Sequence, residues 1–477
     1  MPESRGDELR MVWLVAWREL RDQLRDWRII FPMVVLTLIL PFLADLGAQA
    51  AINFTTKYGT PLVAERLVPF LLMVVGYFPI TISLVIALES FVGEKERGTI
   101  EPLLVSPLKD WQLFTGKLIA GTAAPLVTSY LGISVYMVGL IFQHIPFPHF
   151  NRMMQTLSLT TVQALLMVSG AILISTQATS VRAANLMASF IVIPMAILIQ
   201  GESIMLFWGN DHVLWLAVVG VSILTLLLAR VGIAHFQRES LLGREIDVLN
   251  LRWIGRTFWK GFKGDARTLS GWFRGELLKT LQKQIPAIFM TVGIGIIAAL
   301  AGFGWVASHS AEVAGQYEAG GFSRILSSGI GVPIAASGLS FPSILGHNIQ
   351  AIVIILLSGL FSFGVLGALV YVVNMGVIGA VLAIIRIVGG SPIKMSIYGI
   401  LPHGIFEIPA LILASAAILY IGVMLVTPRP QRTLGEVLIE ALADWAKIGL
   451  GLVLPLLTIA AVIETWVTPI LLLSVVK

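Results

Sequence analysis

Long apolar stretches with few charges recur through this 477-residue chain, from about residue 30 almost to its end. A helix of roughly 20 apolar residues is long enough to cross the hydrocarbon core of a bilayer, which is about 30 Å thick. Hydrophobic residues make up 57% of the chain and charged residues only 12%, so the chain is far more apolar than a soluble domain. The sequence therefore predicts an all-α integral membrane protein.

About 11 transmembrane helices are predicted, six in the first half and five in the second. The first six spans cover residues 30–49, 69–91, 117–142, 156–176, 184–200 and 213–233. The last five cover residues 286–306, 348–367, 369–389, 404–426 and 446–470, with residues 308–346 as an external loop. Residues 1–27 mix both charge signs with apolar residues and show no cleavage site, so we expect an N-terminal interfacial helix.

Basic residues indicate which side of the membrane each connection occupies. The segment 93–117 contains Lys95, Arg97, Lys109 and Lys117, whereas residues 209–211 carry no cation. Because cytoplasmic loops are enriched in Lys and Arg, both ends of the first half are predicted to lie in the cytoplasm.

A basic segment divides the chain into three predicted parts, which are 1–235, a linker 236–284 and 285–477. The linker combines ten Lys and Arg residues with Trp253, Trp259 and Trp272, a composition typical of an amphipathic helix on anionic lipid headgroups. Membrane lipids are thus expected partners, in preference to nucleic acid, despite the net charge of +5. There is no cysteine, which excludes disulfides and thiolate metal sites.

The connection after the second span carries the most informative pattern. Glu94 to Arg97 lie at the cytoplasmic boundary, Gly98 and Thr99 precede a short apolar face, and Pro107 ends it. This pattern predicts a short helix at the membrane surface, which either receives motion from a soluble partner or is simply interfacial. Nearby, Glu89 at the inner end of the second span is expected either to extend to the membrane interface or to pair with Lys95 or Arg97.

This loop resembles the signature loop of the ABC type-2 transporter permeases. The shared residues are Glu94 to Thr99, Glu101, Leu103, Leu104, Ser106, Pro107, Gly116 and Lys117. The resemblance covers roughly residues 1–235 and implies a dimer whose loop acts as a coupling helix for an ABC-type ATPase subunit. The residues expected to couple are Glu94, Glu96, Arg97, Gly98, Thr99, Glu101, Leu104 and Pro107.

The chain itself contains no G-x-x-x-x-G-K-[ST] phosphate-binding loop, so it is predicted not to be an enzyme. ATP and magnesium would be bound by the partner ATPase, and no cofactor is expected on this chain. Four neutral polar residues in the spans are weak candidates for a substrate path: Gln163, Gln177, Asn185 and Gln200.

The second half contains a different set of polar residues within its spans. His403 and Glu407 are one helical turn apart, a spacing that allows a hydrogen bond, a proton relay or two metal ligands. The zinc-protease pattern H-E-x-x-H is absent, and a metal would require further residues such as His347 and Glu464 to converge. A buried polar pair that joins helices is the preferred interpretation, with no metal and no catalytic residue.

The same residues resemble the stage II sporulation protein M family over about 285–477. They form a predicted polar cluster of His347, Asn348, Asn374, His403, Glu407 and Glu464, accompanied by Gly376, Gly379, Pro402, Pro409, Thr468 and Pro469. Family members usually carry Asn-Asn and Asn-Gly where this chain has His347-Asn348 and Asn374-Met375. The resemblance implies a fold and a membrane partner, not a reaction.

These features favour a permease subunit of an ATP-driven ABC transporter, an exporter that works as a homodimer with the second half as an accessory. A membrane scaffold of an envelope complex, without transport, is the alternative hypothesis. An intramembrane hydrolase using His403, Glu407 and Glu464 ranks last, because no constellation at catalytic spacing completes it.

Overall fold

A computed structural model describes residues 5–58, 61–145, 147–178, 180–208, 211–234, 236, 251–311, 314, 340–360, 362–427 and 434–476. These residues form helices and connections, and none of them lies in a β-strand. The chain divides into two compact units, Met1–Leu249 and Asn250–Lys477. The predicted all-α membrane fold is confirmed.

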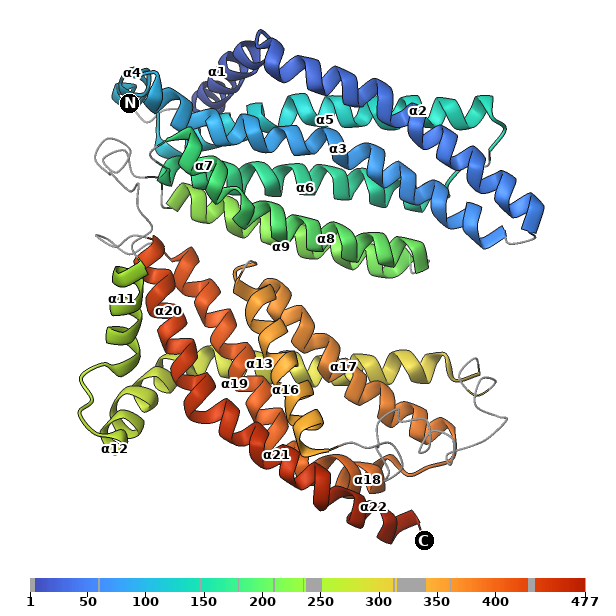
Figure 1. Cartoon of the computed structure of the whole chain (residues 1–477), viewed down its shortest axis with the longest axis vertical. Helices are drawn as coiled ribbons and strands as arrows, with labels where there is room; N and C mark the ends of the chain where they lie inside the picture. The colour runs from blue at the N-terminus through green and yellow to red at the C-terminus, as the bar shows by residue number, and fades with distance from the viewer. Residues whose placement is uncertain are drawn as a thin grey trace. The chain divides into compact units, whose positions relative to one another are not determined.

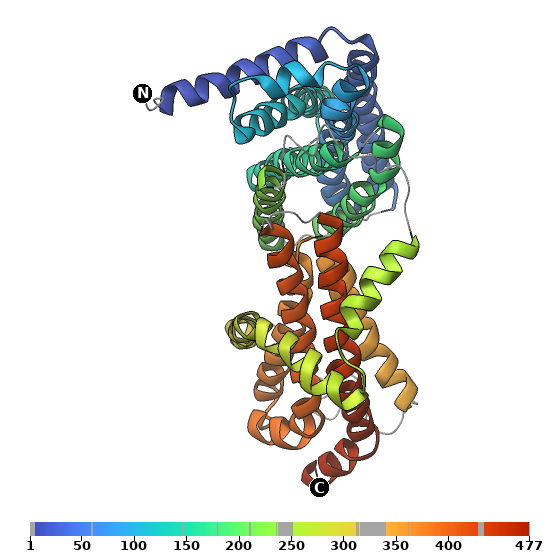
Figure 2. The same ribbon diagram turned by 90° about the vertical axis from the view of Figure 1, so that its left-hand side faces the viewer.

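The first unit begins with a helix that lies crosswise to the others, α1 (Arg5–Gln23), as Figure 2 shows. The remaining helices of this unit are α2 (Trp27–Tyr58), α3 (Pro61–Glu96), α4 (Ile100–Val105), α5 (Asp110–Phe142), α6 (Phe150–Gln177), α7 (Val181–Met187), α8 (Ser189–Trp208) and α9 (Asp211–Ala234).

Helix α3 is the centre of the first unit, packing against α2, α5 and α6 (Figure 1). Small and aliphatic residues of α2, α3 and α5, among them Ala48, Leu72 and Leu140, form a core around the buried ring of Tyr136. Its hydroxyl donates to the backbone oxygen of Val68 at 3.2 Å, so the one polar atom of that ring has a partner within the membrane.

The second unit starts with α11 (Leu251–Lys263), α12 (Leu269–Gly271) and a π-helical turn, η1 (Trp272–Leu277). It continues with α13 (Leu278–Ser308), α16 (Phe341–Leu360), α17 (Val365–Ile387), α18 (Pro392–Met395), η2 (Ser396–Ile400), α19 (Leu401–Val426), α20 (Leu434–Ile448), η3 (Gly449–Val453), α21 (Leu454–Trp466) and α22 (Thr468–Val476).

Glycine contacts bring α13 and α17 together. A Cβ atom added to Gly379 would lie 1.8 Å from the backbone oxygen of Ala299, and one added to Gly302 would lie 2.1 Å from that of Gly376. Because such approaches require the absence of a side chain, Gly379, which the sequence pattern included, and Gly302 fix how closely these helices pack.

Ten helices of the described residues are long and apolar enough to cross a membrane, and Met195–Leu206 forms a shorter apolar segment within α8. That arrangement agrees with the predicted six and five spans. The span predicted at 348–367 instead begins at Phe341, with the next helix starting at Val365. Most of the loop expected at 308–346 lies outside the described residues.

Most of the described residues in the basic segment that was predicted as a linker are helical. Helix α11 packs on α20 and belongs to the same compact unit as the spans that follow. Trp253 and Trp259 are exposed, as lipid contact would require, but Trp272 is buried and donates its ring N–H to the backbone oxygen of Phe262 at 2.8 Å.

Candidate functional site

The C-terminal end of α3 is followed by a glycine, Gly98, whose backbone conformation ends the helix. Gly98 has φ of +67°, in the left-handed region that side chains disfavour, and no atom lies within 4 Å of a Cβ added there. Its N–H donates to the oxygen of Lys95, and the N–H of Thr99 donates to that of Glu94 at 2.9 Å. This pair of bonds is a Schellman C-cap, so the run Glu-Arg-Gly-Thr is a helix stop that turns the chain into α4.

Helix α4 turns one face inward and one face outward. Ile100 is buried, whereas Glu101 is exposed and Val105 is 85% exposed. Pro107 follows the helix and is also exposed. The side chain of Leu104, one of the predicted coupling residues, lies outside the described residues.

Two charged residues at the end of α3 cap neighbouring helices. The Lys95 ammonium group donates to the backbone oxygens of Thr176 at 3.3 Å and Ala178 at 3.1 Å, at the negative C-terminal end of α6. The Glu96 carboxylate accepts the N–H of Val181 at 2.8 Å, at the positive N-terminal end of α7. Figure 1 shows α4 and α7 at this same end of the unit. The loop is thereby fixed to the ends of two further helices.

Lys117 forms a buried ionic junction between α1, α3 and α5. Its side chain is only 1% exposed, and its Nζ lies 3.0 Å from Glu19 Oε1 of α1 and 3.3 Å from Glu94 Oε1 of α3. It also donates to the backbone oxygen of Ser90 at 2.7 Å and lies over the ring of Phe91. Two carboxylates, a carbonyl and a ring compensate for the burial of one ammonium group.

The first helix is held close to the start of α5 by a glycine. A Cβ added to Gly116 would lie 2.7 Å from Val15 Cβ and 3.2 Å from the backbone oxygen of Val12. Lys109, just before α5, pairs with Glu8 at the beginning of α1. In the Gly-Lys pair of the loop pattern, Gly116 thus allows close packing against α1, and Lys117 forms the buried ion pairs.

The structure separates the predicted coupling residues into two groups. Glu94 is directed inward to Lys117, and Glu96 is engaged with α7 while remaining exposed. Arg97, Gly98, Thr99, Glu101 and Pro107 are exposed. The predicted pairing of Glu89 is found with Arg97, at 4.0 Å between two largely exposed side chains, a geometry that contributes little stability.

Sequence reasoning missed a buried acidic residue in α8. Glu202 is 2% exposed and accepts a hydrogen bond from the amide of Gln163, one of the polar candidates, while its Oε1 has no partner. The predicted span ended at residue 200, which placed Glu202 in a connection. Because α8 extends to Trp208, the carboxylate instead lies within an apolar helix, where ionisable groups are costly and commonly functional.

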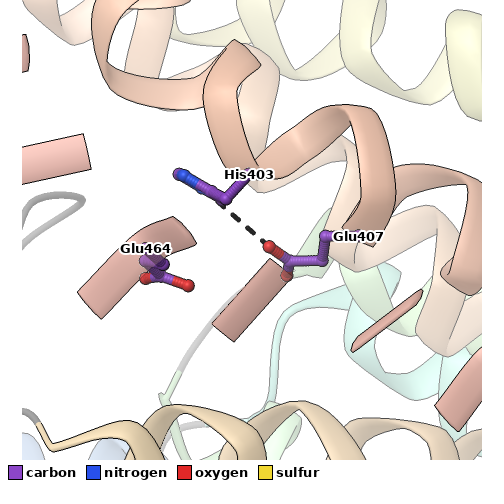
Figure 3. Close-up of side chains that lie close together, drawn as sticks. All are labelled: His403, Glu407 and Glu464. Atoms are coloured by element: carbon purple, nitrogen blue, oxygen red, sulfur yellow. Dashed lines mark ion pairs between the residues drawn. The ribbon is translucent and has the colours of Figure 1, made fainter. Parts of the chain in front are cut away.

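The polar residues of the second unit are only partly brought together (Figure 3). His403 and Glu407 of α19 and Glu464 of α21 offer ligand atoms that all lie within 4.8 Å of one another. The other three are elsewhere. His347 is exposed on α16, Asn374 donates to the oxygen of Val370 in its own helix at 2.8 Å, and the Nδ2 of Asn348 is buried without a partner.

Comparisons with known proteins match the two halves separately. Residues 13–206 match the ABC-2 family transporter protein family, and residues 285–469 match the family of Stage II sporulation protein M. The chain is 32% identical over 133 residues to an uncharacterised protein, MJ0793, of Methanocaldococcus jannaschii, across 27% of this chain and 71% of that one.

Two relatives carry the description of probable ABC transporter permease protein NosY. The one from Pseudomonas aeruginosa is 33% identical over 111 residues, and the one from Stutzerimonas stutzeri is 31% identical over 113 residues. Each match covers 23% of this chain and spans 38% of the relative's length.

Fold, loop and matches together define a multi-pass helical membrane protein of the permease type. Its first half is similar to the ABC-2 transporter family over residues 13–206, and its second half is similar to the Stage II sporulation protein M family over residues 285–469. The first half thus resembles the membrane subunit of an ABC transporter, and a second membrane domain follows it in the same chain.

Proposed function

We propose that a separate ABC-type ATPase drives this protein by binding the exposed face of α4. The observation that carries the proposal is the attachment of the loop 93–117 to the unit at both of its ends. Before α4, Glu94, Lys95 and Glu96 connect α3 to α5, α6 and α7; after it, Lys117 connects α5 to α1 and α3. In the middle of the loop, α4 exposes Glu101 and Val105 to a partner.

This arrangement gives a route for mechanical coupling. A short helix held at both ends cannot yield when pushed, so a displacement of α4 moves the ends of α3 and α5 together. The ion pairs of Lys117 carry the same displacement to α1. When ATP and magnesium close the partner ATPase, the bundle shifts between two access states, provided that the two states bind the partner differently.

The further elements of the proposal rest on the family resemblance. Two copies form the pathway, the direction is outward, and the protein resides in a prokaryotic inner membrane with its N-terminus and α4 in the cytoplasm. The basic residues around α4 support that orientation. The second unit acts as a covalently attached accessory. If transport is outward, the substrate should accumulate with ATP inside inverted vesicles and not inside right-side-out ones.

ATP hydrolysis in nanodiscs tests the central claim. The purified chain is assayed alone, with the ATPase encoded beside it, and with that ATPase after Glu101→Arg. We expect activity only with the partner, a stable complex on size exclusion, and a loss of at least about tenfold in stimulated activity for Glu101→Arg, because one reversed charge at a close contact costs more than about 1.4 kcal/mol.

The matched control is Asp22→Arg, which reverses an exposed acidic side chain at the C-terminal end of α1. It should leave both complex formation and stimulated hydrolysis unchanged. Binding and activity that survive Glu101→Arg would remove α4 from the contact. A partner that never binds, together with unimpaired cell function when its ATPase is catalytically dead, would favour a membrane scaffold.

A further inference from the structure

The most unusual group of side chains outside the coupling loop is the cluster of His403, Glu407 and Glu464. His403 Nε2 lies 3.9 Å from Glu407 Oε2, one turn along α19, and a Glu464 oxygen completes the group from α21. All three residues are partly buried within helices of the membrane-spanning class. Figure 3 shows the three side chains directed toward a shared space.

The ends of α19 and α21 position these three side chains. Pro402 occupies the first turn of α19, just after the π-helical turn η2, so His403 and Glu407 project from the beginning of the helix on one face. Helices α19 and α21 pack together, which brings Glu464 across from them. The chain then breaks at Val467 and restarts as α22 at Thr468. Single π turns of this kind are frequent at functional sites.

A simple locking pair does not account for the charge of the cluster. The sequence alone favoured a buried pair of His403 and Glu407 that joins helices. Such a pair, with the bond from His403 to Thr468, would need no further polar group. Glu464 adds a second carboxylate, and among the residues that the structure describes no lysine or arginine forms an ion pair with Glu407 or Glu464. Two carboxylates this close in a low-dielectric setting repel each other strongly unless a cation or a proton lies between them.

The geometry suits a small dication. Three atoms within 4.8 Å of one another leave a central point at most about 2.8 Å from each. Side-chain rotations that move each atom inward by about 0.6–0.8 Å therefore reach the roughly 2.0–2.2 Å of zinc–nitrogen and zinc–oxygen bonds. His403 Nδ1 lies 3.2 Å from Thr468 Oγ1, and such a bond fixes the ring so that Nε2 faces the carboxylates. Orientation of a ligating imidazole by its second nitrogen is typical of metal sites.

We propose that His403, Glu407 and Glu464 bind one divalent transition-metal ion, with Zn²⁺ as the probe. The imidazole ligand favours zinc and its neighbours over magnesium and calcium, which prefer oxygen alone. Three protein ligands leave at least one position open for water or for another group. The sequence predicted no metal here because the approach of Glu464 depends on the packing of α19 on α21. The site is independent of the ATPase contact, since it belongs to the second unit.

Metal binding by the full chain tests this site directly. The protein is purified in detergent with a tag that contains no histidine, stripped with a chelator, and dialysed against buffered Zn²⁺ in excess Mg²⁺. We expect one zinc per chain by mass spectrometry of the metal. Co²⁺ in place of zinc should give visible absorption bands of a nitrogen and oxygen ligand field. Neither readout depends on transport.

Variants identify the ligands. His403→Gln, Glu407→Gln and Glu464→Gln should each lower zinc affinity by at least about tenfold, and Thr468→Val by a similar or smaller factor. His347→Ala is the matched control, because it removes an exposed histidine of the same unit that lies outside the cluster. Its stoichiometry and affinity should equal those of the native protein.

Helical circular dichroism and elution volume establish that each variant is folded before it is compared. If one variant does not fold, the other two ligand variants decide the question. Failure of the native chain to bind zinc or cobalt would overturn the site, as would native affinity in any folded ligand variant. A loss of binding in His347→Ala equal to that in the ligand variants would also overturn it.

Discussion

The Nζ of Lys117 in α5 lies 3.0 Å from Oε1 of Glu19 in α1, and the lysine side chain is almost completely buried. The same ammonium group lies 3.3 Å from Glu94 of α3, so one cation joins α1 to two spanning helices. This relationship fixes the crosswise helix α1 to the ends of α3 and α5 that flank α4.

Removing the lysine should destabilise the first unit. Lys117→Met retains much of the side-chain volume but leaves Glu19 and Glu94 buried without their cation. Breaking a buried pair in this way costs about 3–5 kcal/mol of unfolding free energy. Thermal unfolding in detergent, followed by tryptophan fluorescence, should show a lowered Tm.

The double variant Lys117→Met with Glu94→Gln should recover part of the loss, because one uncompensated charge is removed. Arg97→Ala provides the contrast. Its ion pair with Glu89 is exposed and 4.0 Å long, so its loss should alter stability by less than about 1 kcal/mol. Equal effects of Lys117→Met and Arg97→Ala would contradict the buried junction.

Gly98 should be required for its backbone conformation alone. Alanine meets no neighbouring atom there but must adopt φ of +67°, at a cost of about 1–2 kcal/mol. We therefore expect Gly98→Ala to loosen the Schellman cap, with faster hydrogen exchange of the Thr99 amide. Gly98→Asn should be milder, because asparagine tolerates the left-handed region better than alanine.

Gly93→Ala is the control for this loop, since its Cβ would meet only an ordinary contact at 3.6 Å and its φ is not positive. It should leave the exchange of Thr99 unchanged. Exchange that is unaffected by Gly98→Ala would show that the cap is not needed to hold α4.

Much of the first unit could be predicted from the sequence, because apolar length and basic flanks are local properties. The short helix after Gly98 and its end near Pro107 were predicted correctly for the same reason. The partners of the charged residues could not be predicted. Glu94 meets Lys117 across 23 positions and Lys95 meets Ala178 across 83, and only the packed bundle brings them together.

The second unit shows the same limit in its polar residues. The helical spacing of His403 and Glu407 predicted that they share a face, as they do. Glu464 joins them by tertiary packing alone, whereas His347 and Asn374, equally prominent in the sequence, do not. The sequence pattern therefore indicated the right residue types, and the packing of the helices brings together three of the six residues in the predicted polar cluster.

Because α13 packs closely on α17, alanine should destabilise the protein at Gly379 but not at Gly376. In Gly379→Ala the new Cβ would lie 1.8 Å from the backbone oxygen of Ala299, so the helices must separate, at a cost of about 1–3 kcal/mol. In Gly376→Ala the nearest atom is 3.6 Å away. Thermal unfolding should show a lower Tm for the first variant and an unchanged or higher one for the second. Similar melting of both would contradict the close approach.

Anionic lipid should associate with α11. Arg252, Arg256 and Lys260 line a hollow on this helix together with Trp259, which is 60% exposed. Each basic residue at an anionic surface contributes about 1 kcal/mol of attraction, so Arg256→Gln with Lys260→Gln should weaken binding of phosphatidylglycerol by about 2 kcal/mol, close to 30-fold. Native mass spectrometry of lipid retained by the purified chain measures this change.

The control is the double variant Arg386→Gln with Lys394→Gln, which removes the same charge from two exposed positions in α17 and α18. It should leave the binding of phosphatidylglycerol unchanged. An equal loss in both double variants would mean that net charge, not the surface of α11, holds the lipid.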